Sequence, residues 1–89
     1  MKNVKWKNTV GSKHEEQHLV FECYSASIYK DPSGWGGDVE GSNWDQIKYY
    51  KPRYKTSAKI KELIQKYIER DLKRREKELS DYVEQLNSL

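Results

Sequence analysis

Residues 56–87 read TSAKIKELIQKYIERDLKRREKELSDYVEQLN. The stretch contains neither Gly nor Pro, and residues with high helix propensity dominate it. Thr56 or Ser57 can act as the N-cap, because a hydroxyl oxygen at that position accepts a backbone N–H that would otherwise lack a partner. We therefore predict one helix from Ala58 to about Asn87.

The first half of this helix carries a dense apolar stripe, which we expect to lie on a sheet. The stripe consists of Ile60, Leu63, Ile64, Tyr67 and Ile68. In the second half the stripe thins to a short heptad seam, formed by Leu72, Leu79, Tyr82 and Leu86. An exposed seam predicts a homodimer through residues 72–89. The alternative is a helix that folds back onto its own sheet.

The length of the helix is large for a chain of 89 residues. A helix of roughly 30 residues is about 45 Å long, at 1.5 Å per residue. A compact domain of this size is only roughly 30 Å across. The helix must therefore either break near residues 73–78 or project beyond the rest of the domain.

The region before the helix has the patterns of β-strands and turns. Alternating apolar residues predict strands over 2–10 and 18–31, and the second of these has apolar residues on both faces, as a central strand does. Asp31-Pro32-Ser33-Gly34 is a strong turn signal. A third strand is expected from Trp35 to about Trp44, with glycines that favour a bulge or an edge position. Residues 45–55 give a short fourth strand with a break at Pro52.

These elements predict a single small α+β domain over residues 1–89. Its expected architecture is a three- or four-stranded antiparallel β-meander within 1–55, followed by one long C-terminal amphipathic helix within 56–89. In outline this arrangement resembles the arm-site DNA-binding domains of phage and transposon integrases, and more distantly small antitoxin domains with a β-hairpin and a helix. The likeness is one of architecture and carries over no site residues.

Several classes of protein are excluded or disfavoured by the composition. There is no run of 18 apolar residues that could span a membrane, and no secretory signal, so we expect a cytoplasmic protein without a membrane partner. Cys23 is alone, which excludes a disulfide framework. The pair His14 and His18 falls in a predicted loop and lacks further metal ligands, so we expect no metal and no cofactor. No catalytic motif is present, and we expect a protein that is not an enzyme.

Charge is distributed unevenly along the chain. Residues 48–77 contain twelve Lys or Arg and four Asp or Glu, a net charge of +8, whereas the chain as a whole has a net charge of +3. Within this region, residues 48–55 interleave basic and aromatic side chains, and five basic residues of the helix fall within a band of about 60°. The candidate binding residues are Lys48, Tyr50, Lys51, Arg53, Tyr54, Lys55, Lys59, Lys66, Arg70, Lys73, Arg74 and Lys77.

Basic side chains neutralise phosphates and aromatic rings stack on bases, so this region favours a small nucleic-acid-binding accessory protein. The competing interpretation is an ordinary solvated helix face with ion pairs such as Glu62 with Lys66 and Glu69 with Lys73. An alternative function is a protein-binding inhibitor or adaptor, for example a phage-encoded antagonist of a host defence complex, that binds an acidic protein surface. We expect Trp44 to pack in the core, and leave Trp35 open between the core and a binding anchor.

Overall fold

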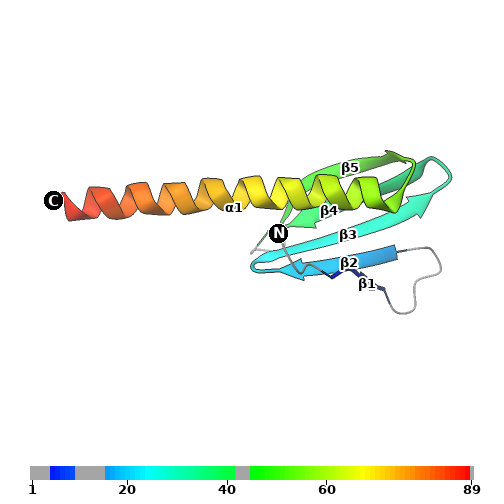
Figure 1. Ribbon diagram of the computed structural model, residues 1–89, viewed down its shortest axis with the longest axis horizontal. Helices are drawn as coiled ribbons and strands as arrows, with labels where there is room; N and C mark the ends of the chain where they lie inside the picture. The colour runs from blue at the N-terminus through cyan, green and yellow to red at the C-terminus, as the bar shows by residue number, and fades with distance from the viewer. Residues whose placement is uncertain (1–4, 10–15, 42–44, 89) are drawn as a thin grey trace.

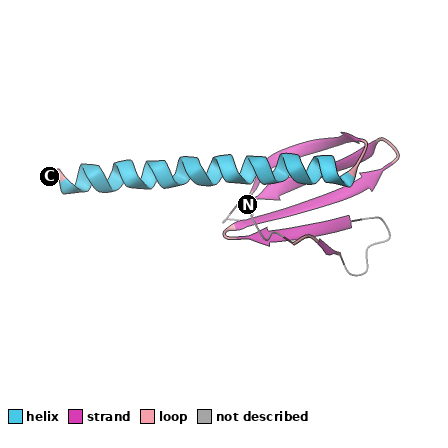
Figure 2. Ribbon diagram, in the orientation of Figure 1, coloured by secondary structure: helices cyan, strands magenta, loops and turns pink. Residues whose placement is uncertain are grey.

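The computed structural model describes residues 5–9, 16–41 and 45–88, and Figure 1 shows a sheet with one long helix lying across it. The sequence of elements is five strands followed by the helix (Figure 2). The elements are β1 (Lys7–Asn8), β2 (Glu16–Phe21), β3 (Tyr24–Asp31), β4 (Gly34–Glu40), β5 (Gln46–Tyr54) and α1 (Ser57–Asn87).

The strands form one antiparallel sheet in the order β1-β2-β3-β4-β5, so that each strand pairs with its neighbour in the sequence. The predicted α+β meander with a C-terminal helix is confirmed, with five strands in place of three or four. The extra strand arises because the predicted strand over 18–31 is a hairpin. The chain reverses at Glu22 and Cys23, where Glu22 has a φ of 54°, and Phe21 pairs with Tyr24.

The predicted turn after β3 is confirmed. Asp31 pairs with Gly34, so Pro32 and Ser33 form a two-residue connection. The Asp31 Oδ1 atom accepts a 2.7 Å hydrogen bond from the backbone N–H of Ser33, which closes the turn locally. Gly34 has a φ of 127°, a conformation that a residue with a Cβ rarely adopts.

Strand β4 has irregular pairing with β5, as its glycines predict, but it is not an edge strand, because it lies between β3 and β5. Gly37 lets the helix approach closely. A Cβ at this position would lie 2.5 Å from the backbone oxygen of Ser27 and 3.1 Å from Cδ1 of Ile64. Gly37 therefore allows close packing against both β3 and the helix.

The predicted break at Pro52 is wrong, because β5 continues through it to Tyr54. Pro52 lies where the pairing with β4 shifts, between the Gly37–Tyr50 and Trp35–Tyr54 partners. β5 is also the last strand of the sheet. Proline is tolerated at an edge or a bulge because no ladder hydrogen bond needs its missing N–H.

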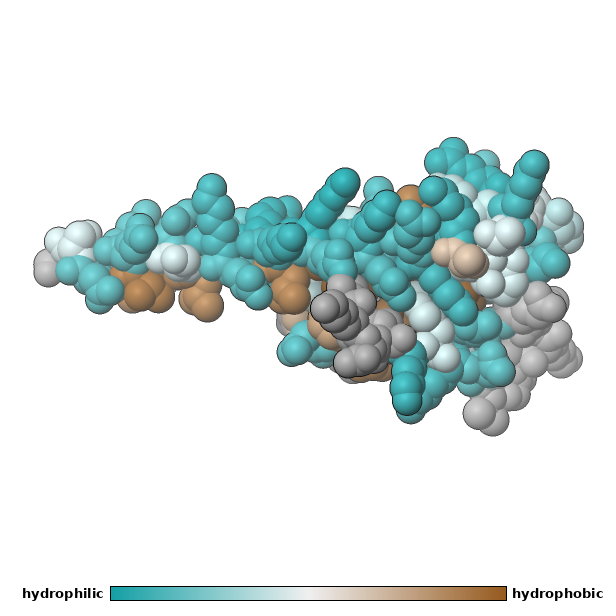
Figure 3. All heavy atoms as spheres, viewed as in Figure 1, coloured by the Kyte–Doolittle hydropathy of each residue, from teal (hydrophilic) through white to brown (hydrophobic). Residues whose placement is uncertain are grey.

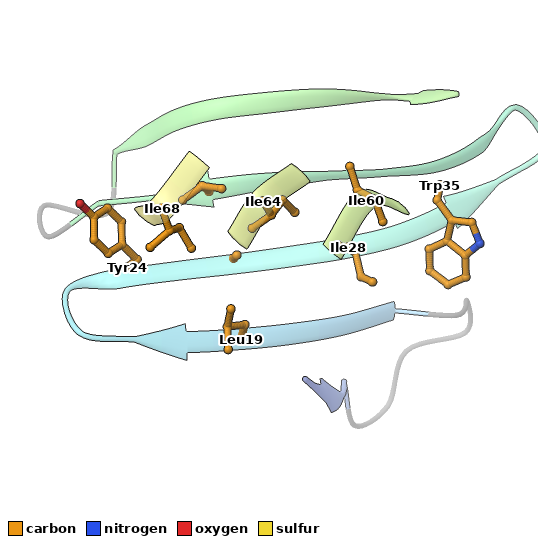
Figure 4. Close-up of a cluster of buried hydrophobic side chains, with 9 residues drawn as sticks. Leu19, Tyr24, Ile28, Trp35, Ile60, Ile64 and Ile68 are labelled. Atoms are coloured by element: carbon orange, nitrogen blue, oxygen red, sulfur yellow. The ribbon is translucent and has the colours of Figure 1, made fainter. Parts of the chain in front are cut away.

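The helix begins where the sequence indicates. The Thr56 hydroxyl oxygen accepts a 3.2 Å hydrogen bond from the backbone N–H of Lys59, which makes Thr56 the N-cap. Ile60, Ile64 and Ile68 of α1 are fully buried, and Figure 4 shows them in a row over the sheet. The buried core consists of Leu19, Tyr24, Ala26, Ile28, Trp35, Val39, Ile60, Ile64 and Ile68.

Trp35 is one of the buried core residues, so of the two alternatives left open by the sequence it belongs to the core and is not a binding anchor. Trp6, which precedes β1, packs against the same core, and the Lys61 ammonium lies 5.9 Å from its ring centroid. Trp44 lies outside the described residues, so its predicted place in the core is not tested.

α1 continues to Asn87 without a break, so of the two alternatives the helix projects. The last buried residue is Asp71, and all residues from Lys73 to Ser88 are exposed. The molecule measures 56 × 24 × 23 Å, since this second half of the helix extends well past the sheet (Figure 1). Within the described part of the chain, no helix is both long and apolar enough to cross a membrane.

Candidate nucleic-acid interface

The predicted basic residues of the helix share one exposed surface, which we call the basic ridge. It consists of Lys59, Lys66, Arg70, Lys73 and Lys77, all of which are exposed. The isoleucines of α1 face the sheet, and the ridge positions lie about 120° or more from Ile64 around the helix, at 100° per residue. The ridge therefore faces away from the core, and Figure 3 shows hydrophilic side chains along the upper side of the helix.

Between residues 59 and 77 no acidic residue falls within the band of the ridge. Glu62 lies next to it and forms an ion pair with Lys66, with 2.8 Å between Oε1 and Nζ. This hydrogen bond lowers the pKa of Glu62. The pair was predicted from the i,i+4 spacing, and because both side chains are half exposed it contributes little to stability.

The aromatic residues of β5 hold the strand to the helix. The Tyr50 hydroxyl donates a 3.3 Å hydrogen bond to the backbone oxygen of Leu63. From the opposite side, the Tyr67 hydroxyl donates a 3.2 Å hydrogen bond to the backbone oxygen of Ile47. Tyr50 and Tyr54 both pack against the core cluster, with their ring centroids 6.4 Å apart in an edge-on arrangement. Both rings are thus engaged in packing.

The basic residues of β5 remain on the surface. Lys48, Lys51, Arg53 and Lys55 are all exposed. The Lys48 ammonium lies 5.3 Å from the Tyr50 ring centroid and 6.0 Å from that of Tyr67, so it sits at the junction of β5 and α1. Arg53 lies over the neighbouring Tyr54 ring at 5.3 Å and donates a 3.2 Å hydrogen bond to its hydroxyl.

The strand and the ridge meet at Arg70. Burial raises the pKa of Tyr50, while the positive charge of Arg70 acts on the same hydroxyl in the opposite direction. A surface hollow of about 260 Å³ lies beside this junction, lined by Tyr67, Arg70, Asp71 and Arg74. Lys48 of β5 and Arg70 of the ridge therefore both lie near Tyr50, where the strand and the helix meet.

Arg74 differs from the other candidate residues in that its partner is a buried carboxylate. One of its guanidinium nitrogens lies 2.6 Å from Oδ1 of the buried Asp71. Arg75 binds the other oxygen of the same carboxylate, with 3.0 Å between Nε and Oδ2. The sequence pattern does not single out Asp71. It is one of many charged residues in the helix, and nothing in the sequence distinguishes a buried acid from an exposed one.

The predicted self-association residues fall into two groups. Leu72 packs against the core cluster and is only partly exposed. Leu79, Tyr82 and Leu86 lie on the projecting part of α1 and are exposed, together with Val83. Only the last group is available to a partner.

The sheet face opposite the helix carries residues that were not among the candidates. Tyr49 is exposed there, and Tyr29 lies beside it with a side-chain hydrogen bond between them. Burial, followed by this hydrogen bond, raises the pKa of Tyr29 to about 12. Burial also raises the pKa of Asp38, as do the nearby charges of Glu40 and Glu16. The two-residue alternation of β3, β4 and β5 could have shown that these side chains share a face.

Among the described residues, no group of three His, Cys, Asp or Glu side chains could hold a metal ion. His18 lies in β2, with its Nδ1 atom 3.3 Å from the Thr9 hydroxyl, so the stretch from Glu16 onward is strand rather than loop. His14 lies outside the described residues.

Comparisons with known proteins give one partial likeness. No protein-family model matches the chain, and no solved structure does. The chain is 34% identical over 68 residues to the small ribosomal subunit protein uS4m of Reclinomonas americana. The aligned region covers 71% of this chain and 27% of the relative, so the chain spans about a quarter of the relative's length.

Proposed function

We propose that this chain is a non-enzymatic nucleic-acid-binding protein and that RNA is its ligand. The observation that carries the proposal is the basic ridge: five exposed cations on one face of α1, with no acid within their band between residues 59 and 77. The ridge from Lys59 to Lys77 is about 27 Å long, at 1.5 Å per residue. A line of cations of this length can follow a phosphate backbone.

The geometry favours contacts with phosphates over contacts with bases. The ridge and β5 supply Lys and Arg side chains, whereas Tyr50 and Tyr67 use their hydroxyls to join β5 to α1. Rings that are half-buried in packing present little face for stacking. Binding should therefore depend strongly on salt and weakly on sequence.

The choice of RNA among nucleic acids rests on the partial likeness to a small ribosomal subunit protein. A ribosomal subunit is an assembly of RNA and protein, and a basic helix face is suited to such an environment. The likeness covers most of this chain but only part of the relative, so RNA as the ligand of this chain is part of the proposal.

The test is a fluorescence anisotropy titration of the full chain against labelled double-stranded RNA, single-stranded RNA and duplex DNA at two salt concentrations. If about six phosphates are neutralised, affinity falls roughly 10³-fold between about 50 and 200 mM salt. A triple variant, Lys59→Gln with Arg70→Gln and Lys73→Gln, should weaken binding and reduce the salt slope by about one for each lost phosphate contact.

The control is a triple variant with the same change in charge elsewhere: Lys5→Gln, Lys7→Gln and Lys30→Gln. These three side chains are exposed and none of them is on α1 or β5. Lys7 lies in β1, at the opposite edge of the sheet from β5, and Lys30 lies in β3. The control should keep most of the affinity and the slope. Equal losses in both variants would mean that net charge alone drives binding, and no binding at low salt would contradict the proposal.

A second candidate function is a protein-binding adaptor or inhibitor that presents the same ridge to an acidic protein surface. The observation in its favour is the ion pair of Lys66 with Glu62, because a ridge cation already binds a carboxylate there. Under this alternative the chain would bind no nucleic acid at low salt, yet the triple ridge variant would lose an acidic protein captured by the unmodified chain. The origin as a phage-encoded antagonist stays a prediction.

A further inference from the structure

The second half of α1 projects into solvent with an apolar stripe on it. We call residues 73–88 the overhang. Its large apolar side chains are 64% (Leu79), 59% (Tyr82), 46% (Val83) and 52% (Leu86) exposed. Scattered apolar residues are normal on a surface, but here four lie within about two turns of one helix. A contiguous stripe of this kind on a free helix points to a partner.

The stripe is a continuation of the helix face that packs on the sheet. Taking Ile64 as the reference, Leu79, Tyr82 and Leu86 lie within about 60° of it around the helix, at 100° per residue. Figure 3 shows the corresponding hydrophobic surface on the lower side of the overhang. The basic ridge is on the other side, so the stripe and the ridge can be occupied at the same time.

The charges of the overhang are separated along its length. Residues 73–77 contain four basic residues and one acid, a net charge of +3, whereas residues 78–88 contain three acids and no base, a net charge of −3. Two such helices in parallel would bring like charges together along their whole length. In antiparallel orientation the basic part of each helix faces the acidic part of the other.

From the stripe and the charges, we propose that the overhang pairs with the overhang of a second copy of this chain as an antiparallel two-helix coiled coil. With the pair centred between Leu79 and Tyr82, each Leu79 packs against Tyr82 of the second copy. Each Leu86 then reaches the position of Arg75 in the second copy, near the end of its sheet.

Arg75 is the polar residue at this otherwise apolar seam. Its charge is compensated within its own chain by Asp71, and its guanidinium carbon lies 5.5 Å from the Tyr24 ring centroid. Because the charge of Arg75 is paired with Asp71, the aliphatic part of its side chain can pack against Leu86 of the second copy. The seam is short, so we expect association in the micromolar to millimolar range rather than a permanent dimer.

The mass of the assembly is the first test, measured by sedimentation equilibrium of the full chain from about 10 μM to about 1 mM. The weight-average mass should rise from 10.6 kDa toward twice that value. Leu79→Glu with Leu86→Glu should keep the mass at that of a monomer. The control, Ser80→Glu with Ser88→Glu, adds the same charge away from the stripe and should still dimerise.

Circular dichroism of both variants checks that the fold is kept, because all four positions are exposed. A monomer throughout the concentration range, an assembly larger than a dimer, or a dimer that persists in the Leu79→Glu, Leu86→Glu variant would overturn the proposal.

Orientation is tested separately by a spin label at Ser88→Cys in a Cys23→Ser background, with the distance between the two labels measured by pulsed electron resonance. In the antiparallel pair residue 88 faces residue 73 of the second copy, so the two labelled positions lie about 22 Å apart along the axis. In a parallel pair they would be only about 10 Å apart, across the interhelical distance. The shorter distance would contradict the antiparallel arrangement.

Discussion

The Tyr24 hydroxyl donates a 2.5 Å hydrogen bond to Oδ2 of Asp71, and thereby joins the first residue of β3 to the last buried position of α1. Burial, and then this hydrogen bond, raises the pKa of Tyr24 well above its usual value. Arg74 and Arg75 bind the same carboxylate. The buried acid is thus fully compensated at the point where the helix leaves the sheet.

Tyr24→Phe should lower the free energy of unfolding by about 1–2 kcal/mol, because Asp71 loses one hydrogen bond while its two arginines stay. Asp71→Ala should lower it further, by about 2–4 kcal/mol, because it leaves a buried hydroxyl and two arginines without their partner. Urea denaturation measures both. Tyr82→Phe on the overhang is the control and should change little, since Tyr82 is exposed. An equally stable Asp71→Ala variant would show that the cluster contributes nothing.

Asp38→Asn should stabilise the protein at neutral pH. The pKa of Asp38 is raised in the folded state, so the protonated form favours folding and the ionised form opposes it. Its contribution to stability is therefore present below the ordinary carboxyl pKa and is lost as the pH rises through the folded-state value. The urea midpoint of Asp38→Asn relative to the unmodified chain should rise between pH 3 and pH 7, whereas a constant difference would contradict the raised pKa.

Gly37→Ala should destabilise the fold by about 1–3 kcal/mol, because the added methyl group would overlap the Ser27 backbone oxygen and press on Ile64. Gly41→Ala is a matched control. A Cβ there would meet Ile47 at 3.5 Å, which is ordinary contact, so this variant should be neutral or gain up to about 1 kcal/mol. The comparison of the two thermal or urea transitions tests whether β4 needs glycine for close packing or merely tolerates it.

Ile64→Ala should cost about 2–5 kcal/mol, because Ile64 is fully buried between α1 and the sheet. Leu79→Ala should change the free energy of unfolding by no more than about 0.5 kcal/mol when both are measured at a low, monomeric concentration. A large loss in Leu79→Ala under those conditions would indicate that the overhang folds back onto its own sheet in solution.

The elements with strong local signals were predictable from the sequence. The Thr56 cap and the isoleucines at positions 60, 64 and 68 define the helix and its buried face. The turn after Asp31 is defined by Pro32 and Gly34, each of which restricts or permits a particular φ. For these residues the conformation favoured by the local sequence is the one that the folded protein adopts.

The elements that were missed depend on tertiary context. The turn at Glu22 and Cys23 contains no Gly, Asn or Pro, yet Glu22 adopts the positive φ that two-residue hairpin connections require. Pro52 looks like a break but lies at an irregularity of an edge strand. In the candidate site, exposure of the ridge followed from helix periodicity. The burial of Asp71, which Arg74 binds, was not predictable in the same way, because its partner Tyr24 is 47 positions away in the sequence.

One half of the continuous helix packs on the sheet and the other half is free. Selection for folding and selection for binding therefore act on different parts of the same helix. Substitutions of the buried residues before residue 72 alter whether the chain folds, since they fall on the core. Between residues 76 and 88, substitutions alter mainly which molecules the helix can contact, because no side chain there packs on the sheet. A new partner could therefore evolve on residues 76–88 without loss of the fold, and we expect sequences of this kind to diverge fastest there.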